Sequence, residues 1–213
     1  MIIELHAKSD VGRVRRGNED NLLLLDLNTG KHWTVGDGPD SPDSLNRLMV
    51  GDQGLVLVVS DGMGGALAGD VASRMAVETV RDMLLGSDPN VTLTPDPDAP
   101  LSDRLRLATI RANTEIHRRG QDPKYTGMGA TFTGASISHN DLLNFVQVGD
   151  SRAYIIRGDQ IKLVTKDQSL VQQLVDVQQI SEEEAETHMF RNVILQALGA
   201  QSDLAPVGSR LSV

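Results

Sequence analysis

The order of apolar and polar positions predicts strands in the first quarter of the chain. Residues 2–8 alternate between the two kinds, as in a half-buried strand, and a leucine-rich run over residues 22–27 predicts a second strand. Residues 28–54 carry Gly, Asp and Pro, and we expect a loop excursion there. Residues 55–59 are continuously apolar and mostly β-branched, which is typical of a strand buried on both faces.

Two amphipathic helices are predicted next. Apolar residues recur at helical spacing over residues 68–85, and Gly86 closes this segment. A second helix is expected over about residues 102–119, where it stops at Gly120. The stretch 87–100 between them is broken by prolines and is expected to be an exposed connection.

In the second half of the chain the hydrophobic period shortens and predicts an antiparallel meander. Turns are expected at residues 139–141 and 158–160. The strands that they join are predicted over residues 131–138, 142–148, 152–157 and 161–165.

The last part of the chain returns to helical patterns. Residues 169–177 are expected to be helical, a capping box over residues 181–184 opens another helix, and an element over residues 192–198 ends at Gly199. Strands, then helices, then strands, without regular βαβ alternation, indicate an α+β fold with antiparallel sheets covered by helices. We expect a single domain over residues 1–213.

Composition limits the class of protein. The chain has 213 residues, of which 39% are hydrophobic, and this is enough for a globular core. No stretch approaches ~18 uninterrupted apolar residues and the start lacks a secretory signal, so we expect neither a membrane span nor export. Cysteine is absent, which excludes disulfides, thiolate metal sites and cysteine nucleophiles. We therefore expect a soluble, cytoplasmic protein.

The net charge limits the kinds of partner that this protein is expected to bind. A net charge of −9 argues against a nucleic-acid-binding protein, which needs a basic face. The few aromatic residues are too scattered to stack on bases. Excess carboxylate suits hard cations, although most Asp and Glu side chains are expected to be solvated surface.

A charged cluster precedes the strand predicted over residues 22–27. It combines Arg15 with the adjacent carboxylates Glu19 and Asp20. Carboxylates beside guanidinium groups also occur as surface ion-pair clusters, so this group alone leaves its role open.

A glycine-rich turn follows the strand predicted over residues 55–59. Asp61 stands at the end of that strand as a rigidly held oxygen ligand, and the glycines from Gly62 onward let the backbone approach an ion. A dinucleotide-binding turn is disfavoured because Leu67 occupies the sixth position of G-x-G-x-x-G, and a P-loop is disfavoured because its lysine is missing. A purely structural turn remains open.

Two further glycine motifs lie in the predicted meander. Residues 149–151 (Gly-Asp-Ser) stand between two strands, and residues 127–129 (Gly-Met-Gly) lead into the strand that contains Thr131. By itself the first motif is a hairpin turn, and the second says little about function.

Together, the order and spacing of these motifs resemble the metal-dependent protein phosphatases of the PPM family (type 2C), especially the bacterial serine/threonine phosphatases. The resemblance covers almost the whole chain. The segments that carry it are Ser9–Gly12, Arg15, Glu19–Asn21, Asp61–Gly65, Gly129–Thr131, Gly149–Tyr154, Thr165–Ser169, His188 and Gln196–Gly199.

The resemblance implies an α+β fold in which an antiparallel β-sandwich is flanked by helices on both faces (α-β-β-α). Residues 166–199 would form a flap beside the cleft. The family's pattern continues past Val213 with two further metal-binding aspartates, so we expect the domain to be incomplete at its C-terminus.

The resemblance also implies a centre of two Mn²⁺ or Mg²⁺ ions. Asp61 would bridge both ions and the Gly62 carbonyl would bind one of them. Glu19 or Asp20 would reach that ion directly or through water. Asp150 would serve a third, weaker metal site.

These residue types suit the hydrolysis of a phosphate ester. Two divalent ions roughly 3.5–4 Å apart can turn a bridging water into hydroxide near neutral pH and neutralise the phosphoryl oxygens. The resemblance implies that Arg15 would hold the substrate phosphate, and a guanidinium can bind phosphate bidentately. Met63 stands where eukaryotic relatives have a histidine, so the general acid is unassigned, and His188 in the flap is expected to be structural.

We therefore expect a metal-dependent phosphoprotein phosphatase that acts on phosphoserine and phosphothreonine and opposes a serine/threonine kinase. The alternative is a catalytically impaired phosphoprotein-binding or regulatory module on the same fold, because two metal ligands of the family are absent from the sequence. Neither nucleic acid nor a membrane is expected as a partner. The sequence leaves the physiological substrate and the oligomeric state open.

Overall fold

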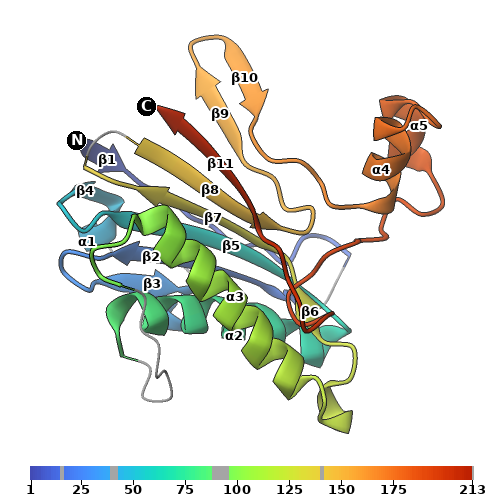
Figure 1. The fold of residues 1–213 in the computed structure, drawn as a ribbon, viewed down its shortest axis with the longest axis horizontal. Helices are drawn as coiled ribbons and strands as arrows, with labels where there is room; N and C mark the ends of the chain where they lie inside the picture. Colours follow the sequence, from blue (N-terminus) through green and yellow to red (C-terminus); the bar gives the residue numbers. More distant parts are fainter. Residues whose placement is uncertain (15–16, 39–42, 88–95, 140–141, 213) are drawn as a thin grey trace.

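The computed structural model describes residues 1–14, 17–38, 43–87, 96–139 and 142–212, and its centre is one large antiparallel sheet (Figure 1). The strands follow one another in the order β11, β8, β7, β5, β2, β3, and β6 pairs with β5. Their bounds are β2 (Asp20–Asp26), β3 (His32–Thr34), β5 (Leu55–Met63), β6 (Gly129–Ala130), β7 (Phe132–Ile137), β8 (Leu142–Val148) and β11 (Val207–Ser212).

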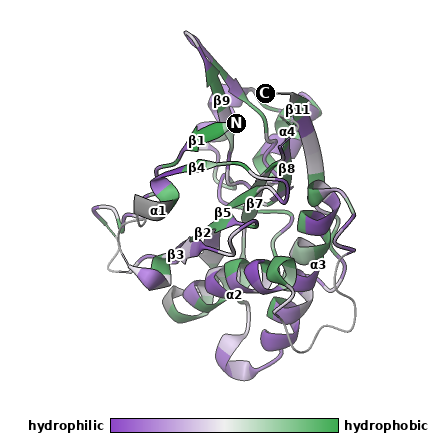
Figure 2. Ribbon diagram, turned by 90° about the vertical axis from the view of Figure 1, so that its left-hand side faces the viewer, coloured by the Kyte–Doolittle hydropathy of each residue, from purple (hydrophilic) through white to green (hydrophobic). Residues whose placement is uncertain are grey.

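Two long helices, α2 (Ala66–Leu85) and α3 (Leu101–Arg119), pack on one face of this sheet (Figures 1 and 2). They confirm the two predicted helices, and α2 ends where Gly86 takes the left-handed conformation at φ 66°. Each large apolar side chain that the helices and the sheet bury together contributes about 1.5–3 kcal/mol. Members of this main core include Leu23, Leu25, Val56, Val77, Leu105, Ile116 and Phe132.

The opposite face of the sheet is covered only in part. A small core of Leu22, Leu24, Trp33 and Leu45 lies there. Farther along β5, Val59 is 47% exposed, so the prediction that this strand is buried on both faces is wrong at that end. The sheet therefore has one closed face and one that opens toward the C-terminal end of β5.

The segment predicted as a loop excursion, residues 28–54, contains regular structure. It holds β3, the 3₁₀ turn η1 (Val35–Asp37), the short helix α1 (Asp43–Asn46) and β4 (Arg47–Met49). β4 pairs with β1 (Ile2–Glu4) in a separate two-stranded sheet. The prediction failed because these strands form through pairing with distant segments, which a local excess of turn residues does not show.

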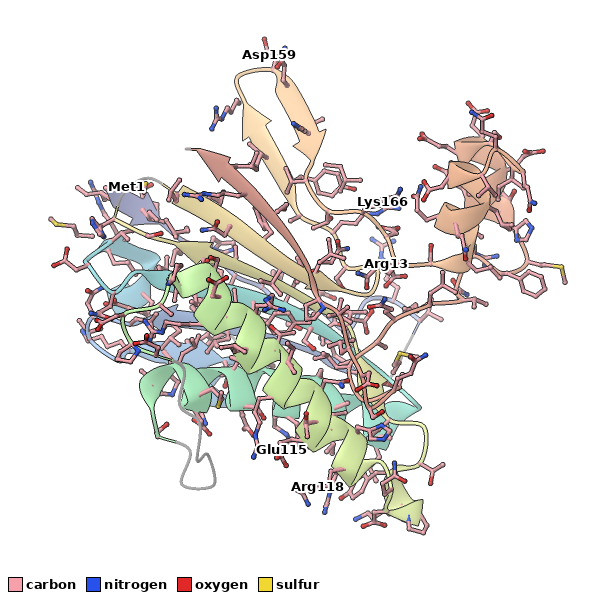
Figure 3. The ribbon with its side chains drawn as sticks, viewed as in Figure 1. Met1, Arg13, Glu115, Arg118, Asp159 and Lys166 are labelled. Carbon is pink, nitrogen blue, oxygen red and sulfur yellow. The ribbon has the colours of Figure 1, made fainter. Side chains whose placement is uncertain are left out.

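The meander is confirmed in part. β7 pairs with β8, and β9 (Tyr154–Arg157) pairs with β10 (Gln160–Leu163), both antiparallel. However, β8 pairs with β11 on its other side, so the hairpin β9–β10 forms a sheet of its own. Figure 3 shows Asp159 at the tip of this projecting hairpin. The prediction of one continuous meander is therefore wrong at the connection between β8 and β9.

The segment after β10 carries two short helices that lie apart from the central sheet (Figure 1). α4 (Leu170–Asp176) and α5 (Glu182–Thr187) confirm the predicted helices. The capping box is also confirmed, since Ser181 Oγ accepts from the Glu184 N–H at 3.1 Å and the Glu184 carboxylate accepts from the Ser181 N–H at 2.8 Å. Residues 192–198 form isolated bridges rather than a regular element.

No helix in the described part of the chain combines the length and the apolar character that a membrane crossing requires.

The contact between β5 and α2 depends on two glycines. A Cβ atom on Gly62 would collide with the backbone carbonyl oxygen of Gly69, and one on Gly69 would collide with the Glu19 carboxylate. The Gly62 N–H also donates to the Glu19 carbonyl at 3.1 Å. The absence of side chains lets the first turns of α2 lie directly against the end of β5.

We predict that Gly62→Ala destabilises the fold by about 1–3 kcal/mol, because the new methyl group must displace helix backbone rather than a flexible side chain. Urea denaturation of the metal-free chain measures the change in the free energy of unfolding. Gly17→Ala is the matched control, since a Cβ there meets nothing within 4 Å. Equal stability of the two variants would contradict this account of the contact.

A second prediction concerns Asp26 at the turn between β2 and β3. Burial raises the pKa of Asp26, but hydrogen bonds from Thr29 Oγ1 (2.7 Å) and the Asn28 N–H (3.0 Å) outweigh this effect and lower the pKa below its ordinary value. The ionised carboxylate therefore stabilises the fold above the unfolded-state pKa of about 3.9, and this contribution is lost as the pH falls through the lower folded-state pKa.

Accordingly, Asp26→Asn should lower the free energy of unfolding at pH 7 by about 1–2 kcal/mol, and the deficit should shrink below about pH 3.9. Denaturation curves at several pH values measure both effects, with Asp52→Asn in an exposed turn as the control. A deficit that is constant with pH would show that the hydrogen bonds do not favour the ionised form.

Candidate functional site

Asp20 and Asp61 lie directly opposite each other in the antiparallel register of β2 and β5. Because side chains alternate along a strand, both carboxylates lie on the face that turns away from α2 and α3, beyond Leu22 and Val59. Cβ atoms of such a pair are about 4.5–5.5 Å apart. Both residues are exposed, so the structure joins two predicted ligands on the open face of the sheet.

These two carboxylates line a small cleft of about 220 Å³. Lys8 and Ser9 from the segment after β1, and Ser151 from the segment after β8, also line it. The cleft is therefore lined by oxygen-bearing side chains from four parts of the chain: the segment after β1, β2, β5 and the segment after β8.

The backbone of Asp61 is held by Thr131, between β6 and β7. The Asp61 N–H donates to Thr131 Oγ1 at 3.0 Å, and the Thr131 N–H donates to the Asp61 carbonyl at 2.9 Å. Ser60 Oγ donates to the Thr131 carbonyl at 2.7 Å from the buried side of the strand. Asp61 therefore presents its carboxylate from a rigid strand end.

Glu19 and Asp20, the adjacent carboxylates, point to different sides. Whereas Asp20 faces Asp61, the Glu19 carboxylate lies against Gly69 of α2. The Glu19 carbonyl accepts from Ser73 Oγ at 2.5 Å as well as from the Gly62 N–H. Of the two residues, Asp20 is the one that shares a cleft with Asp61.

Asp150 follows β8 and lies beside a second cavity of about 370 Å³ between that loop and the helices α4 and α5. Burial raises the pKa of Asp150, and the negative charges of Asp167 and Asp61 raise it further. Asp150 therefore lies close enough to Asp61 to respond to its charge, although the two carboxylates line different hollows.

Arg152 neutralises one carboxylate at this second cavity. Its guanidinium binds Asp167 with Nη2–Oδ2 at 2.7 Å and Nε–Oδ1 at 2.9 Å, and this contact raises the pKa of Arg152. Arg152 and Asp167 both lie within the motifs that carry the family resemblance, but the sequence predicted no role for either. The same is true of Thr131 and Ser151, whose hydroxyl groups meet only in the folded chain.

Three other predictions concern residues around the site. Arg15, the predicted phosphate ligand, lies outside the described residues. Gly62 lies at the end of β5 beside Asp61, as expected from the sequence. His188 accepts a hydrogen bond from the Phe190 N–H at 3.2 Å and its ring lies 5.6 Å from that of Phe190.

The donor atoms at the cleft fit a hard divalent cation. Asp20 and Asp61 supply carboxylates and Asp150 lies nearby, and such oxygen donors suit Mg²⁺ and Mn²⁺. Over the described ranges, no three His, Asp or Glu side chains converge closely enough to form a metal-binding group. The folded chain therefore brings together a carboxylate pair rather than the full set of four predicted carboxylates.

Comparison with known proteins places this chain in a family. Residues 35–200 match the family model described as protein phosphatase 2C. The protein phosphatase PhpP of Streptococcus pneumoniae is 34% identical over 204 residues, which cover 96% of this chain and 71% of that protein. The serine/threonine phosphatase stp of Listeria innocua is 31% identical over 200 residues, covering 92% of this chain and 68% of that protein.

Solved structures agree with the sequence comparison. The Streptococcus agalactiae serine/threonine phosphatase superimposes with a TM-score of 0.74 at 26% identity, covering all of this chain and 74% of that one. The catalytic domain of the phosphatase PstP, solved in complex with two manganese ions, gives a TM-score of 0.69 at 26% identity and covers all of this chain and 74% of its own length. These similarities confirm the predicted fold class. The chain belongs to the protein phosphatase 2C (PPM) family.

Proposed function

We propose that this chain hydrolyses phosphoserine and phosphothreonine esters in phosphorylated proteins by means of divalent cations. The observation that carries the proposal is the carboxylate pair Asp20–Asp61, which faces a cleft at the end of β5 in a chain that belongs to this family. Manganese or magnesium is the expected ion, since the donors are all oxygen and a similar structure contains two manganese ions.

The electrostatics of the cleft support a cation requirement. Two carboxylates on directly opposed residues, whose Cβ atoms are about 5 Å apart in such a pair, repel each other and would also repel a phosphate ester. Asp20 and Asp61 would hold a divalent cation, and its positive charge would offset theirs in front of the strand ends. Such ions supply an activated water and neutralise phosphoryl charge when bound.

Residues of the chain would bind the cations and the substrate phosphate. Asp61 and Asp20 would hold the cation from two paired strands, and Gly62 follows Asp61 in β5 as a further candidate ligand through its carbonyl. Asp150 serves a further, weaker cation site beside the flap. Arg15 binds the substrate phosphate, as the family resemblance implies, and Lys8 adds a positive charge at the edge of the cleft.

The substrate class implies a partner. Phosphorylated proteins are produced by kinases, so this chain opposes a serine/threonine kinase, and we place both in the cytoplasm. The helices α4 and α5 flank the cavity beside Asp150 and would contact the protein part of the substrate.

We predict that Asp61→Asn lowers the manganese-dependent kcat/KM toward a phosphothreonine peptide by roughly 100-fold or more, because it removes a direct cation ligand. Asp20→Asn should cause a large loss as well, and Glu19→Gln a smaller one, since Glu19 faces α2. Phosphate release with and without Mn²⁺ measures these rates.

Asp159→Asn at the tip of the hairpin is the matched control and should retain wild-type rates. Hydrolysis that does not need a divalent cation, or that survives Asp61→Asn, would refute the mechanism. Binding of the phosphopeptide without turnover at saturating Mn²⁺ would instead identify a non-catalytic phosphoprotein-binding module.

A further inference from the structure

We propose that the Ser151 hydroxyl is a catalytic hydrogen-bond donor to a phosphoryl oxygen of the substrate. This inference rests on the proposed function and adds a residue to it. Ser151 lines the same cleft as Asp20 and Asp61, although it comes from the segment after β8 rather than from β2 or β5.

Ser151 is held in place by hydrogen bonds to its backbone. Its carbonyl oxygen accepts from Thr133 Oγ1 at 2.7 Å and from Gln147 Nε2 at 3.4 Å. Thr133 and Gln147 are themselves buried, at 6% and 3% exposure. A side chain fixed by buried partners on a sheet is the kind of support that a precise substrate contact needs.

The direction of the Ser151 hydrogen bond follows from the burial of Thr131. The two hydroxyl oxygens lie 2.6 Å apart, and Thr131 Oγ1 already accepts from the Asp61 N–H. Thr131 is 1% exposed, and Ser151 is its one available acceptor among the described residues. If Ser151 donated instead, the Thr131 proton would be buried without an acceptor, which is unfavourable because a buried donor loses its hydrogen bonds to water. Thr131 is therefore the donor and Ser151 the acceptor.

This assignment leaves the Ser151 proton available to the cleft. Within the described part of the chain, Ser151 Oγ has no protein acceptor, and the residue is only partly buried. The bonds run in one direction, from the Asp61 N–H to Thr131 and from Thr131 to Ser151. In such a series each hydrogen bond polarises the next hydroxyl group and strengthens the bond that this hydroxyl donates.

A phosphoryl oxygen is the acceptor that fits this donor. A substrate phosphate beside a cation on Asp20 and Asp61 lies in the cleft that Ser151 lines. A neutral hydroxyl there stabilises the charged oxygens without being ionised, and no bond to Ser151 forms or breaks. The arrangement also fixes the Ser151 loop, and with it Asp150, to the strand that carries Asp61.

The test compares Ser151→Ala with Ser151→Thr, which keeps a hydroxyl, and with Thr131→Val, which keeps the shape of the side chain but removes its donor. Ser209→Ala on the outer strand β11 is the matched control. We measure kcat/KM with Mn²⁺ for a phosphothreonine peptide and for p-nitrophenyl phosphate, and the Kd of inorganic phosphate by calorimetry.

We expect Ser151→Ala to lower kcat/KM roughly 10- to 100-fold for both substrates and to weaken phosphate binding by about tenfold, as for the loss of a bond to a charged group. Ser151→Thr should stay close to wild type, and Thr131→Val should fall between the two. The melting temperature and the Mn²⁺ affinity of Ser151→Ala should match those of Ser209→Ala.

Wild-type phosphate affinity and wild-type kcat/KM in Ser151→Ala would overturn the assignment. Equal losses of kcat/KM in Ser151→Ala and Ser151→Thr, with a lower melting temperature in both variants, would overturn it as well. If the wild-type chain turns over neither substrate, the proposed function fails, while the phosphate titrations still decide the role of Ser151. A wild-type chain that binds no phosphate would overturn the role of Ser151 as well.

Discussion

The register between β2 and β5 is the constraint on which the site depends. It places Asp20 opposite Asp61, and a slip of one residue would turn one of the two carboxylates toward α2. The two cores fix this register, since Leu23 and Leu25 must face the helices while Leu22 and Leu24 face the other side. Burial of leucines along the strands thus determines where the carboxylates meet at the strand ends.

The ends of β2 and β5 are also held on the face that packs against α2. Ser73 of α2 accepts from Asn21 Nδ2 at 3.0 Å and donates to the Glu19 carbonyl, so one side chain ties the helix to the start of β2. Gly62 and Gly69 bring the helix backbone against the end of β5. The carboxylate pair therefore stands on two strands that α2 holds from behind.

Sequence reasoning succeeded where the information was local. The helices α2 and α3 follow from apolar spacing and from the glycines that end them, and the Ser181 capping box lies within four residues. It failed where pairing is distant, as in β3 and β4 within the predicted loop and in the pairing of β8 with β11. In the site, the sequence predicted Asp61 and either Glu19 or Asp20 as metal ligands, and it could not show that the Glu19 side chain lies against α2. The contact between Thr131 and Ser151 was not predicted, because it joins residues 20 positions apart.

The most direct test of the central claim is a crystal structure of the chain grown with Mn²⁺, with the ions located by anomalous scattering. Our account predicts a manganese peak between the carboxylates of Asp20 and Asp61, with oxygen ligands at about 2.0–2.6 Å as for hard divalent cations. Peaks that all lie away from this pair, at full Mn²⁺ saturation and with the β2–β5 register intact, would contradict it.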